Sequence, residues 1–106
     1  NIVQNNAFIP KVPDWSDPVW HLFVINCNDR TKLQEGLKAV GVETLIHYPI
    51  PPHLQKAYSE LSYTEGSFPI SERLHNSVLS LPVGPTMPIS HAHFIANEVN
   101  KILNKN

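Results

Sequence analysis

The chain has 106 residues, a hydrophobic share of 42% and a formal net charge of −1. This length suffices for one domain with one core, and the balanced charge argues against nucleic acid or an anionic membrane as a partner. Cys27 is the single cysteine and cannot form an intrachain disulfide, and no apolar run approaches the roughly 18 residues of a membrane span. We therefore expect a cytoplasmic protein.

The chain begins with Asn1 rather than methionine. We interpret residues 1–106 as one small domain, cut from a longer chain.

The first elements predicted are two strands. Phe8-Ile9 is a short apolar pair limited by Pro10, which suits an edge strand at most. Val19 to Ile25 is an almost unbroken apolar run, rich in β-branched and aromatic residues. Because this run does not alternate with polar residues, it predicts a strand that is buried on both faces.

A helix and another strand follow. Asn28 or Asp29 offers an N-cap, and Gly41 stands where a left-handed residue ends helices, which predicts a helix from Arg30 to Val40. Its apolar positions recur at spacings of four and three: Leu33, Leu37 and Val40. Val42 to His47 is the next predicted strand. Strand, helix and strand with short connections are typical of a crossover unit whose strands can lie parallel, with His47 at a carboxyl end that receives ligands.

The second half of the chain is mostly helical in pattern. His53 to Leu61 has a weak helical pattern, and Pro69 opens a helix with a stripe formed by Ile70, Leu74 and Val78. Leu79-Ser80-Leu81 alternates like a short strand, and Pro88 begins a last helix. The apolar stripe of that last helix consists of Ala92, Ile95, Val99 and Ile102. We expect an α/β (α+β) fold, with a short mixed sheet covered by three to four helices.

The segment from Thr44 to Gln55 is the strongest candidate for a functional site. His47 and Tyr48 precede three prolines, at 49, 51 and 52, which restrict the backbone and reduce the entropy lost on ordering. With His53 and Gln55, the segment offers four side chains that can bind a polyhydroxylated or phosphorylated molecule. The alternative is a purely structural strand end, in which His47 caps a carbonyl and Tyr48 packs on the prolines.

Motifs that would indicate a complete catalytic site within this chain are absent from the sequence. There is no nucleophile elbow, metal-spaced cysteine pair, His-Glu-x-x-His or phosphate-binding glycine loop. His91 and His93 would lie about 200° apart around a helix, so we expect them to be solvated and predict no metal site. His75 is expected to be a structural or surface residue and Cys27 an inert thiol, and His21 to be either a hydrogen-bonded core residue or part of a site lining.

Several segments together resemble one known family. They are Trp20-His21-Leu22-Phe23-Val24-Ile25, Arg30 with Leu33, Gly41-Val42, Ile46-His47-Tyr48-Pro49, Pro52-His53-Leu54-Gln55 and Leu79-Ser80-Leu81-Pro82. In this order and spacing the chain resembles, from about Phe8 to Leu103, the C-terminal part of the DegT/DnrJ/StrS family. Members are pyridoxal phosphate-dependent aminotransferases that act on nucleotide-linked keto sugars. Asn26 departs from the basic residue often found there, so an anion contact from this strand end is not expected.

The resemblance implies the small C-terminal domain of a fold type I aminotransferase, which closes over a larger cofactor-binding domain. It implies pyridoxal 5'-phosphate, a nucleotide-linked keto sugar, an amino-acid donor and a homodimer for the whole protein. Substrate-binding roles carry over to His47, Tyr48 and, as a weaker candidate, His53.

The catalytic lysine of the family belongs to the larger domain, and no lysine of this chain stands in a matching context. We therefore expect no catalytic residue and no cofactor in these 106 residues. The competing hypothesis is a non-catalytic regulatory or binding module with the same fold.

Overall fold

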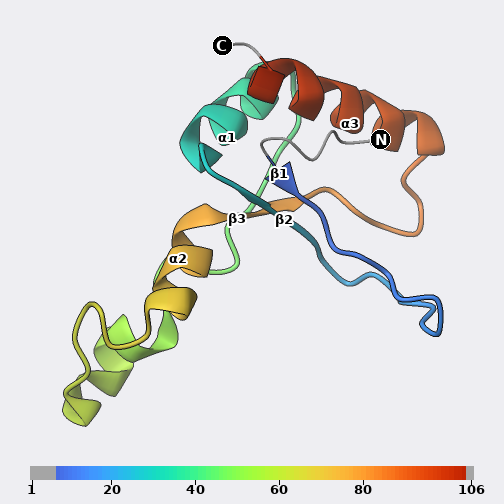
Figure 1. Cartoon of the computed structure of the whole chain (residues 1–106). Coiled ribbons are helices and arrows are strands. Elements are labelled where there is room, and N and C mark those ends of the chain that lie inside the picture. Colours follow the sequence, from blue (N-terminus) through green and yellow to red (C-terminus); the bar gives the residue numbers. More distant parts are fainter. Residues whose placement is uncertain (1–6, 105–106) are drawn as a thin grey trace.

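The computed structural model describes residues 7–104, which form a small antiparallel sheet, a helical layer and a projecting helical segment (Figure 1). The elements in chain order are β1 (Ala7–Phe8), β2 (Phe23–Cys27), α1 (Arg30–Ala39), the 3₁₀ helices η1 (Pro52–Leu54) and η2 (Lys56–Leu61), α2 (Pro69–Ser77), β3 (Val78–Leu81) and α3 (Ile89–Asn104). The predicted class, a small mixed domain of strands and helices, is confirmed.

The strands lie in the order β1-β2-β3, and both pairings are antiparallel. The predicted parallel crossover is therefore wrong, and residues 42–47 form no strand. Because β1 and β3 already occupy both edges of β2, the segment after α1 cannot pair with β2 and lies instead at the free edge of β3. It pairs with that edge through a single antiparallel bridge between Leu45 and Ser80.

The apolar run before β2 is only partly a strand. Pairing begins at Phe23, whereas Val19 is 96% exposed and Trp20 packs edge-on against Phe23, with ring centroids 5.1 Å apart. Within β2, Ile25 and Cys27 are fully buried, while Phe23, Val24 and Asn26 are half-buried. Within residues 7–104 the core lies on one side of the sheet. Burial of the other face by a further layer or another protein surface stays a prediction.

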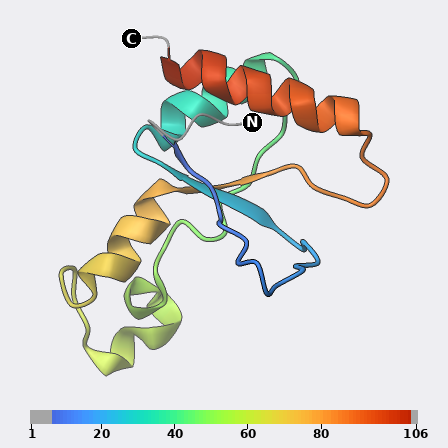
Figure 2. The same cartoon turned by 45° about the vertical axis from the view of Figure 1, so that its right-hand side comes forward.

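Helices α1 and α3 pack together against the side of the sheet that carries the core (Figures 1 and 2). The buried core consists of Ala7, Ile25, Cys27, Leu33, Leu37, Val42, Leu79, Leu81, Ile95, Val99 and Leu103. The two helices approach closely at Gly36, where an added Cβ would lie 2.8 Å from Cδ1 of Ile102. A side chain at position 36 would thus push the two helices apart.

The helix predictions hold well where capping residues support them. The Asp29 carboxylate accepts a hydrogen bond from the Lys32 amide, and Gly41, with φ of +81°, follows the end of α1. The predicted helix at residues 30–40 is confirmed to within one residue, and those opened by Pro69 and Pro88 are also present. The weak pattern at residues 53–61 corresponds to two 3₁₀ helices instead of an α-helix.

Residues 46–77, which we call the arm, carry η1, η2 and α2 away from the sheet (Figure 2). None of these three helices contributes a buried side chain, and Ile70 and Leu74 of the predicted stripe remain 65% and 43% exposed. The arm is therefore held largely by polar contacts. Within residues 7–104, none of the helices has the length and apolar character needed to cross a membrane.

Candidate functional site

His47 lies where the arm leaves the sheet, two residues after the bridging Leu45. Its Nδ1 is 2.8 Å from the hydroxyl oxygen of Ser80, and the Ser80 residue is only 5% exposed. Ser80 also pairs with Val24 in the sheet. The imidazole is thus oriented by a buried hydroxyl of the sheet, which leaves Nε2 as its second polar atom.

The ring of His47 lines a hollow of about 320 Å³ at the edge of the sheet. The other polar residues that line this hollow are His21, Glu43, Thr44 and Ser80. The apolar part of the lining is Leu22, Leu45, Leu81, Pro82 and Val83. His21, for which the sequence left two roles open, is exposed and belongs to the lining. The hollow offers imidazole, carboxylate and hydroxyl groups suited to hydrogen-bonding a polar ligand.

Tyr48 stands beside His47 with its side chain directed outward. The two rings meet edge-on, with centroids 5.4 Å apart and planes at 88°, and Tyr48 is 63% exposed. The peptide bond between them is cis. The main-chain carbonyl of Tyr48 accepts a hydrogen bond from Nδ1 of His75. Gln55, a predicted ligand group, donates its amide to the Ile50 carbonyl instead and so ties the proline loop together.

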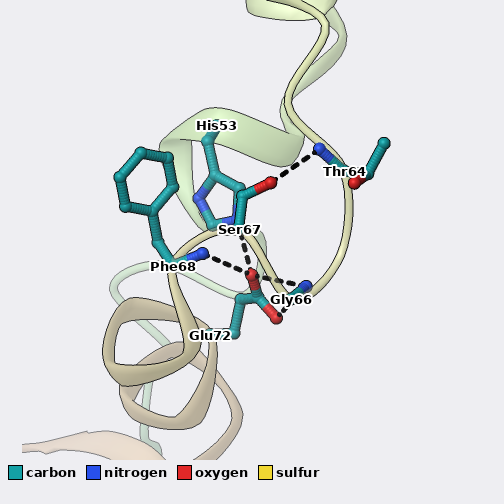
Figure 3. Close-up of polar contacts among 6 residues, drawn as sticks. All are labelled: His53, Thr64, Gly66, Ser67, Phe68 and Glu72. Carbon is teal, nitrogen blue, oxygen red and sulfur yellow. Dashed lines mark hydrogen bonds and ion pairs between the residues drawn. The ribbon is translucent and has the colours of Figure 1, made fainter.

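His53 is held in a second cluster, around the carboxylate of Glu72 (Figure 3). Nε2 of His53 donates to this carboxylate over 2.8 Å, and its ring packs edge-on against Phe68. The backbone amides of Gly66 and Phe68 donate to the same carboxylate over 2.9 to 3.1 Å. The Gly66 amide, with help from His53 and Phe68, holds the pKa of Glu72 below its usual value.

This second cluster closes the polar loop before α2. Glu72 bonds the amide of Phe68, the N-cap residue of that helix, in the manner of a capping residue. Ser67 accepts a hydrogen bond from the Thr64 amide in the same loop. The His53 side chain is only 7% exposed. The structure therefore brings His47 and Tyr48 together and places His53 with Glu72, outside the hollow that His47 lines.

Two partners in these clusters escaped the sequence reasoning. Ser80 stands between two leucines of a predicted strand, where a buried hydroxyl needs a partner and so signals one. Glu72 lies in the first turn of the helix that Pro69 opens, and no site role was predicted for it. Its signal is its place three residues after the Pro69 that opens the helix, where a carboxylate can reach back to free backbone amides.

The remaining candidates have structural surroundings. Burial raises the pKa of the Cys27 thiol, and nearby Arg30 offsets this only in part. His91 and His93 are exposed on α3. In the part of the chain that the structure describes, no three side chains of His, Cys, Asp or Glu are grouped so as to hold a metal ion.

Comparison with known proteins gives one consistent result. The family model of the DegT/DnrJ/EryC1/StrS aminotransferases matches residues 3–100. The chain is 47% identical over 98 residues to the dTDP-3-amino-3,6-dideoxy-alpha-D-galactopyranose transaminase of Aneurinibacillus thermoaerophilus, covering 91% of this chain and 26% of that protein. It is 49% identical over 89 residues to the erythromycin biosynthesis sensory transduction protein EryC1 of Saccharopolyspora erythraea, covering 83% of this chain and 24% of that protein.

A solved structure agrees with these sequence matches. The crystal structure of S. venezuelae DesV in complex with a ketimine intermediate superposes with a TM-score of 0.88 at 37% identity, covering 95% of this chain and 27% of that one. The chain thus spans about a quarter of the length of these relatives.

Proposed function

The chain belongs to the DegT/DnrJ/EryC1/StrS aminotransferase family, and from this premise we propose that it is the C-terminal domain of an enzyme that aminates a nucleotide-linked keto-deoxysugar. The observation that carries the proposal is the 47% identity to a dTDP-sugar transaminase across nine-tenths of the chain. The whole protein would use pyridoxal 5'-phosphate and an amino-acid donor, and these 106 residues alone would not catalyse the reaction.

His47 and Tyr48 are the groups that we propose to contact the sugar. The bond from Ser80 fixes the imidazole of His47, so that Nε2 can meet a sugar hydroxyl or the keto oxygen at a defined angle. The Tyr48 phenol is exposed and can donate to the same molecule. Together they would orient the keto carbon toward the cofactor held elsewhere in the protein.

His53 stays a third proposed contact, with a different geometry. Its Nε2 is engaged by Glu72, so Nδ1 is the atom left for a ligand. Its small exposed fraction means that a ligand must reach the rim of the Glu72 cluster to meet it.

The cofactor does not fit the residues of this chain. Pyridoxal phosphate supplies the electron sink of a transamination and needs a lysine to hold it. None of the five lysines within residues 7–104 lines the hollow beside His47, and Lys101 is paired with Glu98. We therefore assign no cofactor contact here and place the lysine in the remainder of the protein.

Assembly and location are part of the same proposal. We propose a homodimer, which the exposed apolar side chains of the arm support, because such surfaces usually meet a partner. The most exposed of them are Ile50, Leu61 and Ile70. A single, buried thiol suits a reducing compartment, so we propose the cytoplasm.

The second candidate is a non-catalytic regulatory module. It is favoured by one observation, that a relative with 49% identity bears the name of a sensory transduction protein. A lysine in the cofactor loop of the preceding domain would favour the enzyme, and its absence would favour the regulator.

The test uses the full-length protein supplied with pyridoxal phosphate. We expect a visible absorbance band from lysine-bound cofactor, its shift on addition of glutamate, and transfer of the amino group to a nucleotide-linked keto sugar. Absence of both band and transfer in folded protein would contradict the enzyme and leave the regulator.

The loop assignment needs its own variants. We expect Tyr48→Phe and His47→Ala to reduce turnover of the keto sugar while the fold is retained. Tyr58→Phe, at a tyrosine of the arm that is also about half exposed, serves as control. Unchanged kinetics in both site variants would show that this loop does not face the substrate.

A further inference from the structure

We propose that Arg30 and His75 are positioning residues for the sugar site, because they link the helix layer to the main chain of Tyr48. The expected effect on kinetics rests on the proposed function, whereas the hydrogen-bonded link does not. The link itself consists of two hydrogen bonds between residues far apart in the sequence. Neither residue lines the hollow beside His47.

The first bond joins α2 to the proline loop. Nδ1 of His75 lies 2.5 Å from the carbonyl oxygen of Tyr48, a residue 27 positions earlier in the chain. A carbonyl can only accept, so Nδ1 must carry the proton, and the imidazole is fixed as donor. Since the bond is made to the main chain, it constrains the backbone of Tyr48 and leaves the phenol free to face a ligand.

The second bond joins α2 to α1. The guanidinium of Arg30 donates through one terminal nitrogen to the carbonyl oxygen of His75, which lies in the last turn of α2. Carbonyls at that end of a helix lack intrahelical partners, and a cation there also complements the helix dipole. Arg30 is the first residue of α1, and that helix is anchored in the core by Leu33 and Leu37.

The two bonds matter because α2 is otherwise tied to the sheet mainly at its C-terminal end, where Ser77 continues directly into β3. The helix contributes no buried side chain, so apolar packing adds little to its position. The link runs from the core through Arg30 and His75 to Tyr48, and the bond between His47 and Ser80 holds the preceding residue. With both ends held, the His47-Tyr48 pair is ordered before substrate arrives, and less entropy is lost on binding.

The test compares His75→Ala with His75→Asn in the full-length enzyme. An asparagine amide nitrogen occupies nearly the position of Nδ1 and can donate to the same carbonyl. We expect His75→Ala to reduce kcat/KM for the sugar nucleotide by about tenfold, the effect of one lost hydrogen bond, with the KM of the amino donor unchanged. His75→Asn should restore most of this loss, and Arg30→Lys should retain more activity than Arg30→Ala.

A double variant tests whether His75 acts through Tyr48. If it does, Tyr48→Phe combined with His75→Ala should lose less than the product of the two separate losses. Independent losses that multiply, or failure of His75→Asn to recover activity, would overturn the inference.

Amide hydrogen exchange separates this inference from the proposed function. In His75→Ala and Arg30→Ala, exchange should accelerate in the peptide that contains Tyr48, and His75→Asn should reverse the change. His93→Ala, at an exposed histidine of α3, is the matched control. Unchanged exchange would overturn the link whatever the kinetics show, whereas altered exchange with unchanged kinetics in both Tyr48→Phe and His47→Ala would preserve the link and refute the loop as a substrate site.

Discussion

Nδ1 of His47 and the hydroxyl of Ser80 are 2.8 Å apart, although 33 residues separate them in the chain. Ser80 exchanges two backbone hydrogen bonds with Leu45, over 2.8 and 3.2 Å, and pairs with Val24 on its other side. The residue that orients His47 is thus fixed on both flanks by the sheet. The direction of the imidazole is determined by the core and not by the loop that carries it.

Replacement of Ser80 by alanine should therefore impair the site more than the fold. The substitution removes the hydrogen-bond partner of Nδ1 of His47. Because alanine is smaller than serine, it introduces no steric clash. We expect kcat/KM for the sugar nucleotide to fall by about tenfold and the melting temperature to change little. Ser77→Ala, at a half-buried serine whose hydroxyl donates to carbonyls of its own helix, is the control. Equal kinetics in Ser80→Ala and the parent would show that this bond has no part in turnover.

We expect the Glu72 carboxylate to stabilise the fold in a way that depends on pH. Its pKa is lowered in the folded chain from the ordinary value of 4.5, because the carboxylate accepts from Gly66, His53 and Phe68. The ionised form is thus favoured by folding, so its stabilising effect is complete above about pH 4.5 and is lost as the pH falls through the lowered pKa.

Glu72→Gln should lower the melting temperature at neutral pH by a few degrees. The difference in melting temperature between Glu72→Gln and the parent should shrink as the pH falls below the pKa that the carboxyl has in the unfolded chain. Melting curves across the acid range measure this, with Glu60→Gln, at an exposed residue of η2, as control. A difference that stayed constant down to strong acid would contradict the assigned role of the charge.

Replacement of Gly36 by alanine should create a steric conflict between α1 and α3. Alanine at this position gains up to about 1 kcal/mol in helix propensity, but overpacking a tight contact costs about 1–3 kcal/mol. Because the new Cβ would lie 2.8 Å from Cδ1 of Ile102, we expect a net loss of about 1 kcal/mol in the free energy of unfolding.

Ile102→Val removes the conflicting methyl group and provides the matched test. The double variant Gly36→Ala with Ile102→Val should be more stable than the sum of the two single losses predicts, in denaturant titrations of each protein. Strict additivity would show that the two residues do not compete for the same space.

Cys27 should be unreactive in the native protein. Its side chain is fully buried, and its pKa is raised above the ordinary value of 9.0, so little thiolate is present or accessible. We expect iodoacetamide to label the peptide containing Cys27 orders of magnitude faster in denaturant than in the native state, with little native labelling even near pH 9. Rapid native labelling, read by mass spectrometry, would contradict this.

The elements that could be predicted are those with local signals. Asp29 and Gly41 mark the two ends of α1, Pro69 is the first residue of α2 and Pro88 directly precedes α3, so the boundaries follow from capping and proline chemistry. The direction of strand pairing has no such signal. Whether Val24 lies beside Ser80 or beside Leu45 depends on which edges of β2 are already occupied, and that is decided only in three dimensions.

The candidate site divides in the same way. The rigidity of the loop and the ligand chemistry of His47 and Tyr48 follow from their own residue types and from the prolines beside them. Their supports, Ser80 and His75, lie 33 and 27 residues away, and no spacing rule connects residues so distant. Distant hydrogen-bond partners must be read from coordinates.

The bridge between Leu45 and Ser80 has a consequence for how such a protein can diverge. The chain leaves the sheet at Leu45 and returns to it at Ser80, where paired backbone hydrogen bonds close the circuit. Because the entry and exit of the arm are clamped together, extra or missing residues at its far end add only the slow, logarithmic cost of a longer loop. Length changes near η2 can therefore alter the reach of the arm while the strand register beneath it stays unchanged.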